Sequence, residues 1–446
     1  MTEKTPGSQR LLAATFLGTA VIQRAAPFIV VVVLAATVPV DLIGQFGIMA
    51  ATFSLILVLS TIGLESAAFR GHFISEHSTR NSDYFSVVAK LTVIPPLICG
   101  LAIALSALAY GGTIFGVPAG ALGVSAMGAT LTASATTLPT ARFRANSQPI
   151  PYAALLIVPA IIGSGTKLLL CTPANLGTLG WGIGDLASGF AAWLIAGSFL
   201  IPDLLAGRWS RTTATALLGL SLPLVPHVAS SWALALVDRF LVASMTNPTE
   251  LGIYSYLTQL STIGLILTTE LNRFLSPRYG QIASDPEREN CDLRRSVVAS
   301  ANLQRRVSIL LLMGSLALVT LFVARVVGDP YTDSIELLPL SALGFLAYSF
   351  YYPCMNVASI GLGRTKGVPL ITASAALVKI AIGAATIPLI GATGAALGGI
   401  AGYSVLWLGL AHYTRDYRLA WSSESKLLAV FALFSFTALS ILMWWH

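Results

Sequence analysis

The chain has 446 residues, of which 55% are hydrophobic and only 10% charged, and its formal net charge is +7. A soluble domain carries about 25% charged residues, so this composition excludes a large soluble protein and favours lipid as the solvent. The four cysteines lack the spacing of a metal or redox site. The basic residues collect in short loops and form no nucleic-acid-binding motif. We therefore expect no metal, no cofactor and no nucleic-acid partner.

Thirteen apolar segments are long enough to cross a bilayer as helices, which takes about 20 apolar residues each. Helices this apolar, and not barrel strands, are expected because lipid offers backbone groups no hydrogen-bond partners. The predicted fold is therefore an all-α polytopic membrane protein. In chain order the segments cover residues 11–36, 43–65, 86–110, 114–138, 150–172, 178–202, 213–243, 251–275, 307–327, 335–361, 367–390, 392–413 and 427–445.

Lys and Arg predict the orientation of these spans. With the N-terminus in the cytoplasm, 20 of the 26 basic residues fall on the cytoplasmic side, and only Arg325 falls on the outer side. Membrane proteins show this asymmetry because basic loops stay in the cytoplasm. The longest polar stretch, Pro277 to Arg306, is then expected to be a cytoplasmic loop or surface helix.

A weak internal repeat indicates two six-helix halves. Glycines spaced by three and then four residues open the sixth and the twelfth segments, and Lys167 and Lys379 lie in the fifth and the eleventh. Transporters are commonly built from such repeats, with the substrate site between the halves. We expect an N-lobe at 1–202, a C-lobe at 203–413, and a C-terminal segment at 414–446 with a thirteenth span. The glycines concerned are Gly177, Gly180, Gly184, Gly391, Gly394 and Gly398.

Charged residues within the spans are the candidate functional residues, because each costs at least about 2.5 kcal/mol at the bilayer centre. Arg24 lies deep in the first span, three residues before Pro27. Its depth favours a wet cavity over snorkelling to the headgroups. Lys167 and Lys379 could attract one anion, such as a pyrophosphate, from both halves. The alternative for these lysines is pairing with local groups.

Two charged pairs have a second interpretation. Asp238 and Arg239 are neighbours near the outer end of the seventh span, where adjacent helical residues do not pair cleanly and interfacial anchoring is a serious alternative. Glu270 and Arg273 are three residues apart and share one helix face. They form either a self-neutralising pair or a protonatable acid beside a substrate-binding cation.

These residues give the predicted site. Other buried titratable groups that could relay protons are Asp185, Glu65 and His227, with Glu65 ranked lower. No GxxxxGK[ST] loop is present, so ATP is not expected to power the chain. No catalytic pattern is found in an extramembrane region, so we expect no enzyme. The predicted substrate-binding residues are Arg24, Lys167, Arg239, Arg273 and Lys379, and the predicted coupling residues are Glu270, Asp238 and Asp185.

Several strings in order resemble a known family over nearly the whole chain, from Leu11 to about Tyr413. They resemble the polysaccharide transport branch of the multidrug/oligosaccharidyl-lipid/polysaccharide (MOP) superfamily, the Wzx-type flippases. The strings are Gly44-Gln45-Phe46, Asp238-Arg239-Phe240-Leu241, Leu251-Gly252-Ile253-Tyr254-Ser255, Gly361-Leu362-Gly363-Arg364-Thr365-Lys366 and Gly391-Ala392-Thr393-Gly394-Ala395-Ala396.

The resemblance implies two six-helix lobes in a V around a cationic cavity, working by alternating access. It implies a carrier of undecaprenyl-pyrophosphate-linked oligosaccharide, moving it from the cytoplasmic to the periplasmic leaflet of the bacterial inner membrane. The gradient of a coupling ion, H⁺ or Na⁺, would drive it. Its products would serve O-antigen, exopolysaccharide or capsule synthesis, with a polymerase and chain-length machinery as partners. The thirteenth span departs from the family's twelve.

Three alternatives are kept. A MATE-like drug/cation antiporter would share the lobes but favour acidic residues in its cavity. A lipid II flippase usually resembles a fourteen-span chain. A membrane-bound O-antigen polymerase or ligase would need a sizeable periplasmic loop, and the predicted outer loops are short.

Overall fold

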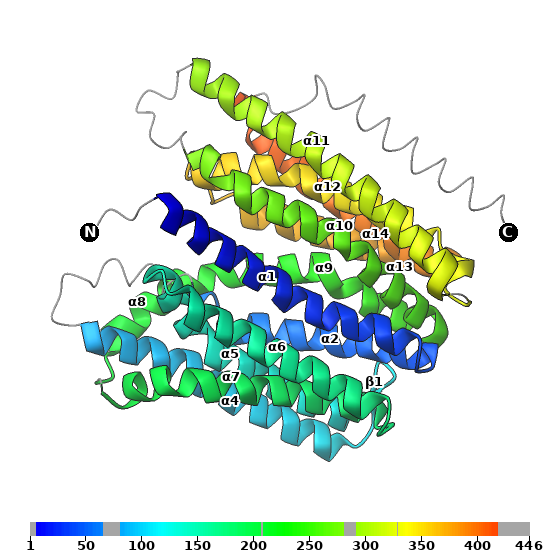
Figure 1. The fold of residues 1–446 in the computed structure, drawn as a ribbon, viewed down its shortest axis with the longest axis horizontal. Helices are drawn as coiled ribbons and strands as arrows, with labels where there is room; N and C mark the ends of the chain where they lie inside the picture. The colour runs from blue at the N-terminus through cyan, green and yellow to red at the C-terminus, as the bar shows by residue number, and fades with distance from the viewer. Residues whose placement is uncertain (1–5, 66–80, 207, 281–290, 328, 418–446) are drawn as a thin grey trace. The chain divides into compact units, whose positions relative to one another are not determined.

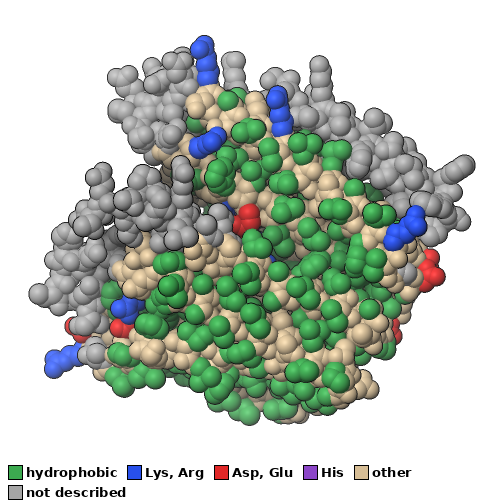
Figure 2. Space-filling model, viewed as in Figure 1, with side chains coloured by type: hydrophobic (Ala, Val, Ile, Leu, Met, Phe, Trp, Pro, Cys, Tyr) green, Lys and Arg blue, Asp and Glu red, His purple; other side chains and the backbone are tan. Residues whose placement is uncertain are grey.

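The computed structural model describes residues 6–65, 81–206, 208–280, 291–327 and 329–417, which are almost entirely helical (Figure 1). Ten helical segments in this part of the chain are long and apolar enough to cross a membrane. On the face drawn in Figure 2, hydrophobic side chains cover much of the described surface and charged ones are few. The predicted all-α membrane fold is confirmed.

Each of the first twelve predicted spans falls on a helix, and the thirteenth, 427–445, lies outside the described residues. The first six spans correspond to α1 (Pro6–Ala35), α2 (Val40–Thr61), α4 (Asn81–Tyr110), α5 (Ala119–Ala145), α6 (Pro149–Cys171) and α7 (Gly177–Ala206). The next six correspond to α8 (Arg211–Ser221) with α9 (Val225–Met245), α10 (Pro248–Gly280), α11 (Cys291–Phe322), α12 (Leu337–Asn356), α13 (Val368–Ile390) and α14 (Ala392–Tyr413).

Short elements lie at the ends of these helices. A two-stranded antiparallel hairpin, β1 (Thr113–Ile114) and β2 (Val117–Pro118), precedes α5. Phe115 and Gly116 form its turn with positive φ values of 51° and 76°. A helix cannot pass through such a turn, so the fourth span begins five residues later than the predicted residue 114. The remaining short helices are η1 (Leu222–Leu224), η3 (Val323–Val327), η4 (Thr332–Ser334), η5 (Val357–Gly361) and η6 (Arg415–Tyr417).

The seventh predicted span is two helices joined by a single 3-10 turn. Ser210 caps α8, where its side chain accepts a hydrogen bond from the Thr213 amide at 3.3 Å. Pro223 and Pro226 then fall around η1. Each proline lacks an amide donor and crowds the preceding turn, which explains the break.

The described residues of the polar stretch from Pro277 to Arg306 are helical, which agrees with the helical alternative and not with a loop, and part of this stretch is buried. It contains the end of α10 and the beginning of α11, with residues 281–290 outside the described part. Gln304 and Arg305 are buried in α11 at 0% and 1% exposure. The high local charge resembles a loop in the sequence, but this half of α11 packs against α10 and α12.

The chain forms two compact units, Met1–Trp232 and Ala233–His446. The division lies within α9, whereas the six-helix count places it at 202/203; the lobe limits by helix count stay a prediction. In the first unit α5 contacts α2, α4 and α7, and in the second α12 contacts α10, α11 and α14. Both α5 and α12 are the fourth helix of a six-helix half when α8 and α9 count as one, so the same pairing recurs within each.

Glycines at equivalent positions of the sixth and twelfth helices have the same two structural roles, a positive φ value at the helix start and close packing against the preceding helix. Gly177 and Gly391, at the starts of α7 and α14, have φ values of +52° and +60°, which only glycine adopts at little cost. A Cβ on Gly184 would lie 3.2 Å from the Lys167 amide nitrogen. One on Gly398 would lie 2.8 Å from the Lys379 carbonyl oxygen. These glycines therefore let each helix pack closely over the lysine of the preceding one.

Close packing of α5 against α7 generates a stability prediction. A Cβ at Gly128 would lie 2.5 Å from the backbone carbon of Asp185. Gly128→Ala is therefore expected to destabilise the first unit by about 1–3 kcal/mol through overpacking. Thermal unfolding in detergent should show a lower midpoint, by about 2–4 °C per kcal/mol.

The matched control for this substitution is Gly165→Ala in α6, where an added Cβ meets nothing within 4 Å. Helix propensity alone should leave that variant unchanged or more stable by about 1 kcal/mol. Equal midpoints for the two variants would contradict the packing described here.

Candidate functional site

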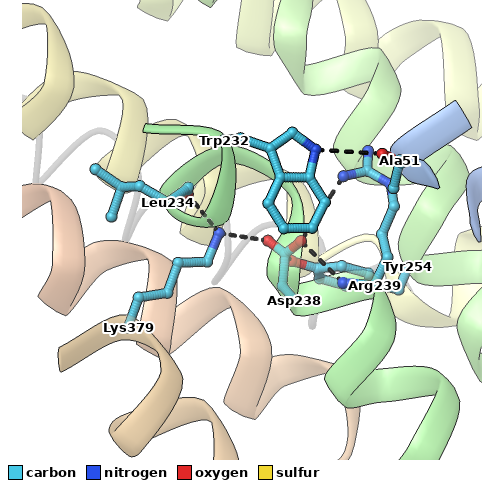
Figure 3. Close-up of polar contacts among 7 residues, drawn as sticks. All are labelled: Ala51, Trp232, Leu234, Asp238, Arg239, Tyr254 and Lys379. Atoms are coloured by element: carbon cyan, nitrogen blue, oxygen red, sulfur yellow. Dashed lines mark hydrogen bonds and ion pairs between the residues drawn. The ribbon is translucent and has the colours of Figure 1, made fainter. Parts of the chain in front are cut away.

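A buried polar cluster in the second unit centres on Asp238 of α9 (Figure 3). Its Oδ2 accepts a hydrogen bond from Lys379 Nζ of α13 at 2.6 Å and from Tyr254 Oη of α10 at 2.8 Å. Lys379 Nζ also donates to the Leu234 carbonyl at 2.8 Å. Arg239 Nη1 lies 3.7 Å from Asp238 Oδ1. The cluster thus brings together three residues of the predicted site, Asp238, Arg239 and Lys379.

The local sequence explains how Tyr254 reaches Asp238. Only two residues separate α9 from α10, and the hydrogen bond from Tyr254 to Asp238 joins the two helices. Asn247 caps α10, where its side chain accepts from the Glu250 amide at 2.8 Å, and Pro248 occupies the first helical position. Lys379 lies 141 residues after Asp238 in the sequence, so no local sequence pattern predicts this pairing.

Asp238, Arg239 and Lys379 are 4%, 5% and 3% exposed, so they lie inside the second unit and do not act as interfacial anchors. They line a cavity of about 140 Å³. The formal charges of these three residues sum to one excess positive charge. The other residues that line this cavity include Tyr254, Thr258, Gln259, Thr262, Ser341, Phe345 and Tyr403.

A second charged pair, of the buried Asp185 and the largely buried Lys167, lies in the first unit. Lys167 Nζ of α6 is 2.6 Å from Asp185 Oδ1 of α7, and Ser125 Oγ of α5 donates to Asp185 Oδ2 at 2.5 Å. The ammonium also lies 4.2 Å from the Trp181 ring centroid, and that ring stacks on Phe46 at 4.6 Å. An aromatic face attracts a cation, so carboxylate and indole together hold the ammonium in place.

This pair borders a cavity of about 310 Å³ in the first unit. Lys167, Trp181 and Asp185 line it together with the hydroxyl residues Thr132, Thr136, Ser164 and Ser188. Arg24 is half-buried on α1 and is not a lining residue, although its neighbours Gln23 and Pro27 are. Arg24, a predicted site residue, therefore does not line this cavity, although residues near it in the sequence do.

The two lysines are equivalent in the repeat, but their carboxylates are not. Lys167 pairs with an acid on the sixth helix of its half, whereas Lys379 pairs with one on the first helix of its half. The local-pairing alternative therefore describes part of both environments. The cavities beside the pairs are the feature that local pairing does not explain.

Glu270 and Arg273 of α10 form the contact expected from their spacing, at 2.8 Å between Oε1 and Nη1. The Arg273 side chain is 47% exposed and the Glu270 side chain 15%. Neither residue lines the two cavities described above. The structure therefore separates this pair from the Asp238 cluster.

A neutral network joins α10, α11 and α12 and was missed from the sequence. Tyr279 Oη donates to Gln304 Oε1 at 2.8 Å, and Gln304 Nε2 donates to Asn272 Oδ1 at 2.9 Å. Asn356 Nδ2 donates to the same oxygen at 2.8 Å. The sequence did contain a signal for this network, namely amide side chains within otherwise apolar spans. Ser125 and Tyr254 carried none, because hydroxyl groups are common in membrane helices.

The chain is similar to known membrane proteins. A family model described as "Polysaccharide biosynthesis protein" matches residues 13–281, more than half of the chain. An inward-facing multidrug resistance MATE family transporter of the MOP superfamily aligns with 90% of this chain and 96% of its own, at a TM-score of 0.65 and 14% identity. The comparison with curated proteins finds no match.

Two further solved structures show the same fold. Lipid II flippase MurJ, in an inward closed conformation, aligns with 97% of this chain and 98% of its own, at a TM-score of 0.62 and 14% identity. The Vibrio cholerae MATE transporter VcmN aligns with 92% of this chain and 97% of its own, at a TM-score of 0.56 and 14% identity. The expected MOP-superfamily fold is thereby confirmed.

The Lys167–Asp185 pair generates a prediction about stability. Lys167→Met leaves Asp185 buried without its cation, and breaking a buried pair in this way costs about 3–5 kcal/mol. The neutral double variant Lys167→Met/Asp185→Asn leaves no buried charge and should regain most of that loss. Thermal unfolding in detergent measures both variants. A single variant as stable as the double one would show that the pair is not held in a dry environment.

Proposed function

Because this chain belongs to the polysaccharide biosynthesis protein family and has the MOP-superfamily fold, we propose that it is a flippase for lipid-linked oligosaccharides. It carries undecaprenyl-pyrophosphate-linked units from the cytoplasmic to the periplasmic leaflet of the bacterial inner membrane. Its N-terminus lies in the cytoplasm, and the glycan serves surface polysaccharide synthesis. A polymerase and chain-length machinery would use the delivered units.

The observation that carries this proposal is the presence of basic side chains beside cavities inside both units. Lys167 lines the cavity of about 310 Å³, and Arg239 and Lys379 line the cavity of about 140 Å³. Charged residues within membrane spans are costly and mark substrate or ion pathways. A diphosphate that leaves water needs charge-assisted hydrogen bonds of the kind these groups can donate.

The balance of charge favours an anionic substrate over the cationic drugs of an antiporter. Asp185 balances Lys167 in the first cavity, and the second cavity carries one excess positive charge. Neither cavity carries the net negative charge that would attract a cationic drug. A lipid II flippase is the second candidate, supported by the MurJ fold similarity, and family membership favours polysaccharide units.

The repeated architecture supports alternating access as the proposed mechanism. The same helix pairing recurs in both units, and transporters built from such repeats commonly work by rocking of one half against the other. Coupling to H⁺ or Na⁺ requires a carboxylate that changes its partner during the cycle. Asp185, Asp238 and Glu270 are the proposed candidates, because each already lies next to a basic side chain.

Single alanine substitutions test the basic residues proposed to bind substrate directly or to hold its site, Arg24, Lys167, Arg239, Arg273 and Lys379. Each should lower surface polysaccharide in a complementation assay by about tenfold or more, since a lost charged hydrogen bond costs about 1.5–3 kcal/mol. Arg144→Ala is the matched control, because its pair with Glu65 is about half exposed. Full export by all five variants, at wild-type protein levels, would refute the proposed site.

Glu270→Gln tests the coupling role. The substitution keeps the shape of the side chain and removes the charge that faces Arg273. We expect flipping in proteoliposomes to stop responding to an imposed proton gradient, while Asp416→Asn, an exposed partner of Arg364, responds like the wild type. An unchanged response of the Glu270 variant would remove this residue from the coupling mechanism.

A further inference from the structure

We propose that Arg239 is the anion-binding side chain of the second unit, and that Lys379 and Tyr254 act on it indirectly by engaging Asp238. Arg239 and Lys379 thus have different tasks, although both are buried cations on one cavity. The inference rests on the proposed function, since it assigns the phosphate-binding group of that site. It concerns residues of the second unit alone.

Two of the three N–H donors of the Lys379 ammonium are already occupied, and both bind groups of α9. Its Nζ donates to the Leu234 carbonyl at 2.8 Å and to Asp238 Oδ2 at 2.6 Å, and the residue is 3% exposed. If the ammonium turned to a ligand, it would leave a buried carboxylate and a buried carbonyl without this donor. Buried groups deprived of partners are strongly disfavoured, so Lys379 is suited to hold Asp238 and not to bind a ligand.

Asp238 is likewise occupied by groups other than the Arg239 guanidinium. Its Oδ2 accepts from Lys379 and Tyr254, and its Oδ1 accepts from the Arg239 backbone amide at 2.9 Å. Arg239 Nη1 is 3.7 Å from Oδ1, beyond hydrogen-bonding distance. Within the described part of the chain, this buried nitrogen makes no hydrogen bond. The nitrogen is almost fully enclosed and lacks a partner, so an acceptor that enters the cluster would satisfy it.

This nitrogen belongs to a residue on a cavity wall. Arg239 lines the cavity of about 140 Å³ together with Thr258, Gln259 and Thr262, whose side chains also carry hydrogen-bonding groups. Liquid water occupies about 30 Å³ per molecule, so the cavity has room for a small oxyanion. A guanidinium presents its donors in a planar fork that matches phosphate oxygens. The ligand class is therefore a phosphate or diphosphate group.

The arrangement gives a physical role to the buried lysine. Asp238 and Arg239 are adjacent, and without another cation the carboxylate would draw the guanidinium to itself. Lys379 satisfies the carboxylate, so the excess positive charge of the cluster remains on Arg239. Lys379 is in this sense a positioning residue, and its loss should matter only while Asp238 is present.

Binding of inorganic pyrophosphate to the purified full chain, measured by calorimetric titration in detergent, tests the inference. Arg239→Gln and Lys379→Met should each weaken binding by about 10- to 100-fold, the range expected for a charged hydrogen bond. The double variant Asp238→Asn/Lys379→Met should bind within a few-fold of the wild type, because no carboxylate then competes for Arg239. Arg364→Gln, at an exposed pair, is the control and should bind like the wild type.

Two more variants separate this role from net charge and from misfolding. Arg239→Lys keeps the charge but loses the fork, so it should bind more weakly than the wild type; equal binding would mean that charge alone matters and would overturn the inference. Asp238→Asn alone should bind more tightly, and it remains informative if Lys379→Met does not fold. Unfolding midpoints of all variants show which of them are folded.

The results have distinct meanings. A double variant as weak as Lys379→Met would show that the lysine contacts the anion itself, and the inference would fall while the flippase proposal stands. Unchanged pyrophosphate binding by Arg239→Gln would also overturn it. The proposed function fails separately, if the wild-type chain binds pyrophosphate but moves no lipid-linked oligosaccharide in proteoliposomes.

Discussion

The pairing of charges buried inside membrane helices is the constraint on which the site depends. A lone lysine among apolar helices is costly, and it becomes tolerable when a carboxylate lies beside it. Lys167 and Asp185 join α6 to α7, and Lys379 and Asp238 join α13 to α9. Each pair therefore fixes two helices relative to each other and at the same time holds a cation at a cavity wall. Gly184 of α7 brings the backbones of α6 and α7 close enough for the first of these contacts.

The repeat supplies a common scaffold with different electrostatics in its two copies. The fourth helix contacts the second, third and sixth helices in both units, and a glycine of the last helix packs over a lysine in both. The acids, however, come from non-equivalent helices, and only the second unit adds an arginine. One cavity is balanced and the other carries an excess positive charge, so the halves are not interchangeable for an anionic ligand.

Much of the fold could be predicted because apolar runs of spanning length have few alternatives to a helix in lipid. The errors arose where local backbone geometry decides, at the Phe115–Gly116 turn and the prolines around η1. Arg305 was expected in a solvated loop or surface helix because its segment is highly charged, whereas tertiary packing buries it. The cations of the site were conspicuous in the sequence. The carboxylates Asp185 and Asp238 were also predicted as functional residues, but their pairing with the lysines was not, since Asp238 and Lys379 are 141 residues apart.

The network of Asn272, Gln304, Tyr279 and Asn356 adds a different kind of cross-link to the second unit. It is made of amides and one phenol, which carry no charge at physiological pH. Protonation of a carboxylate can break an ion pair, but it leaves the hydrogen bonds of this neutral network intact. The hydrogen bonds between α10, α11 and α12 therefore do not depend on the proton gradient proposed to drive transport. These three helices can stay bundled while acid-dependent contacts elsewhere are remade.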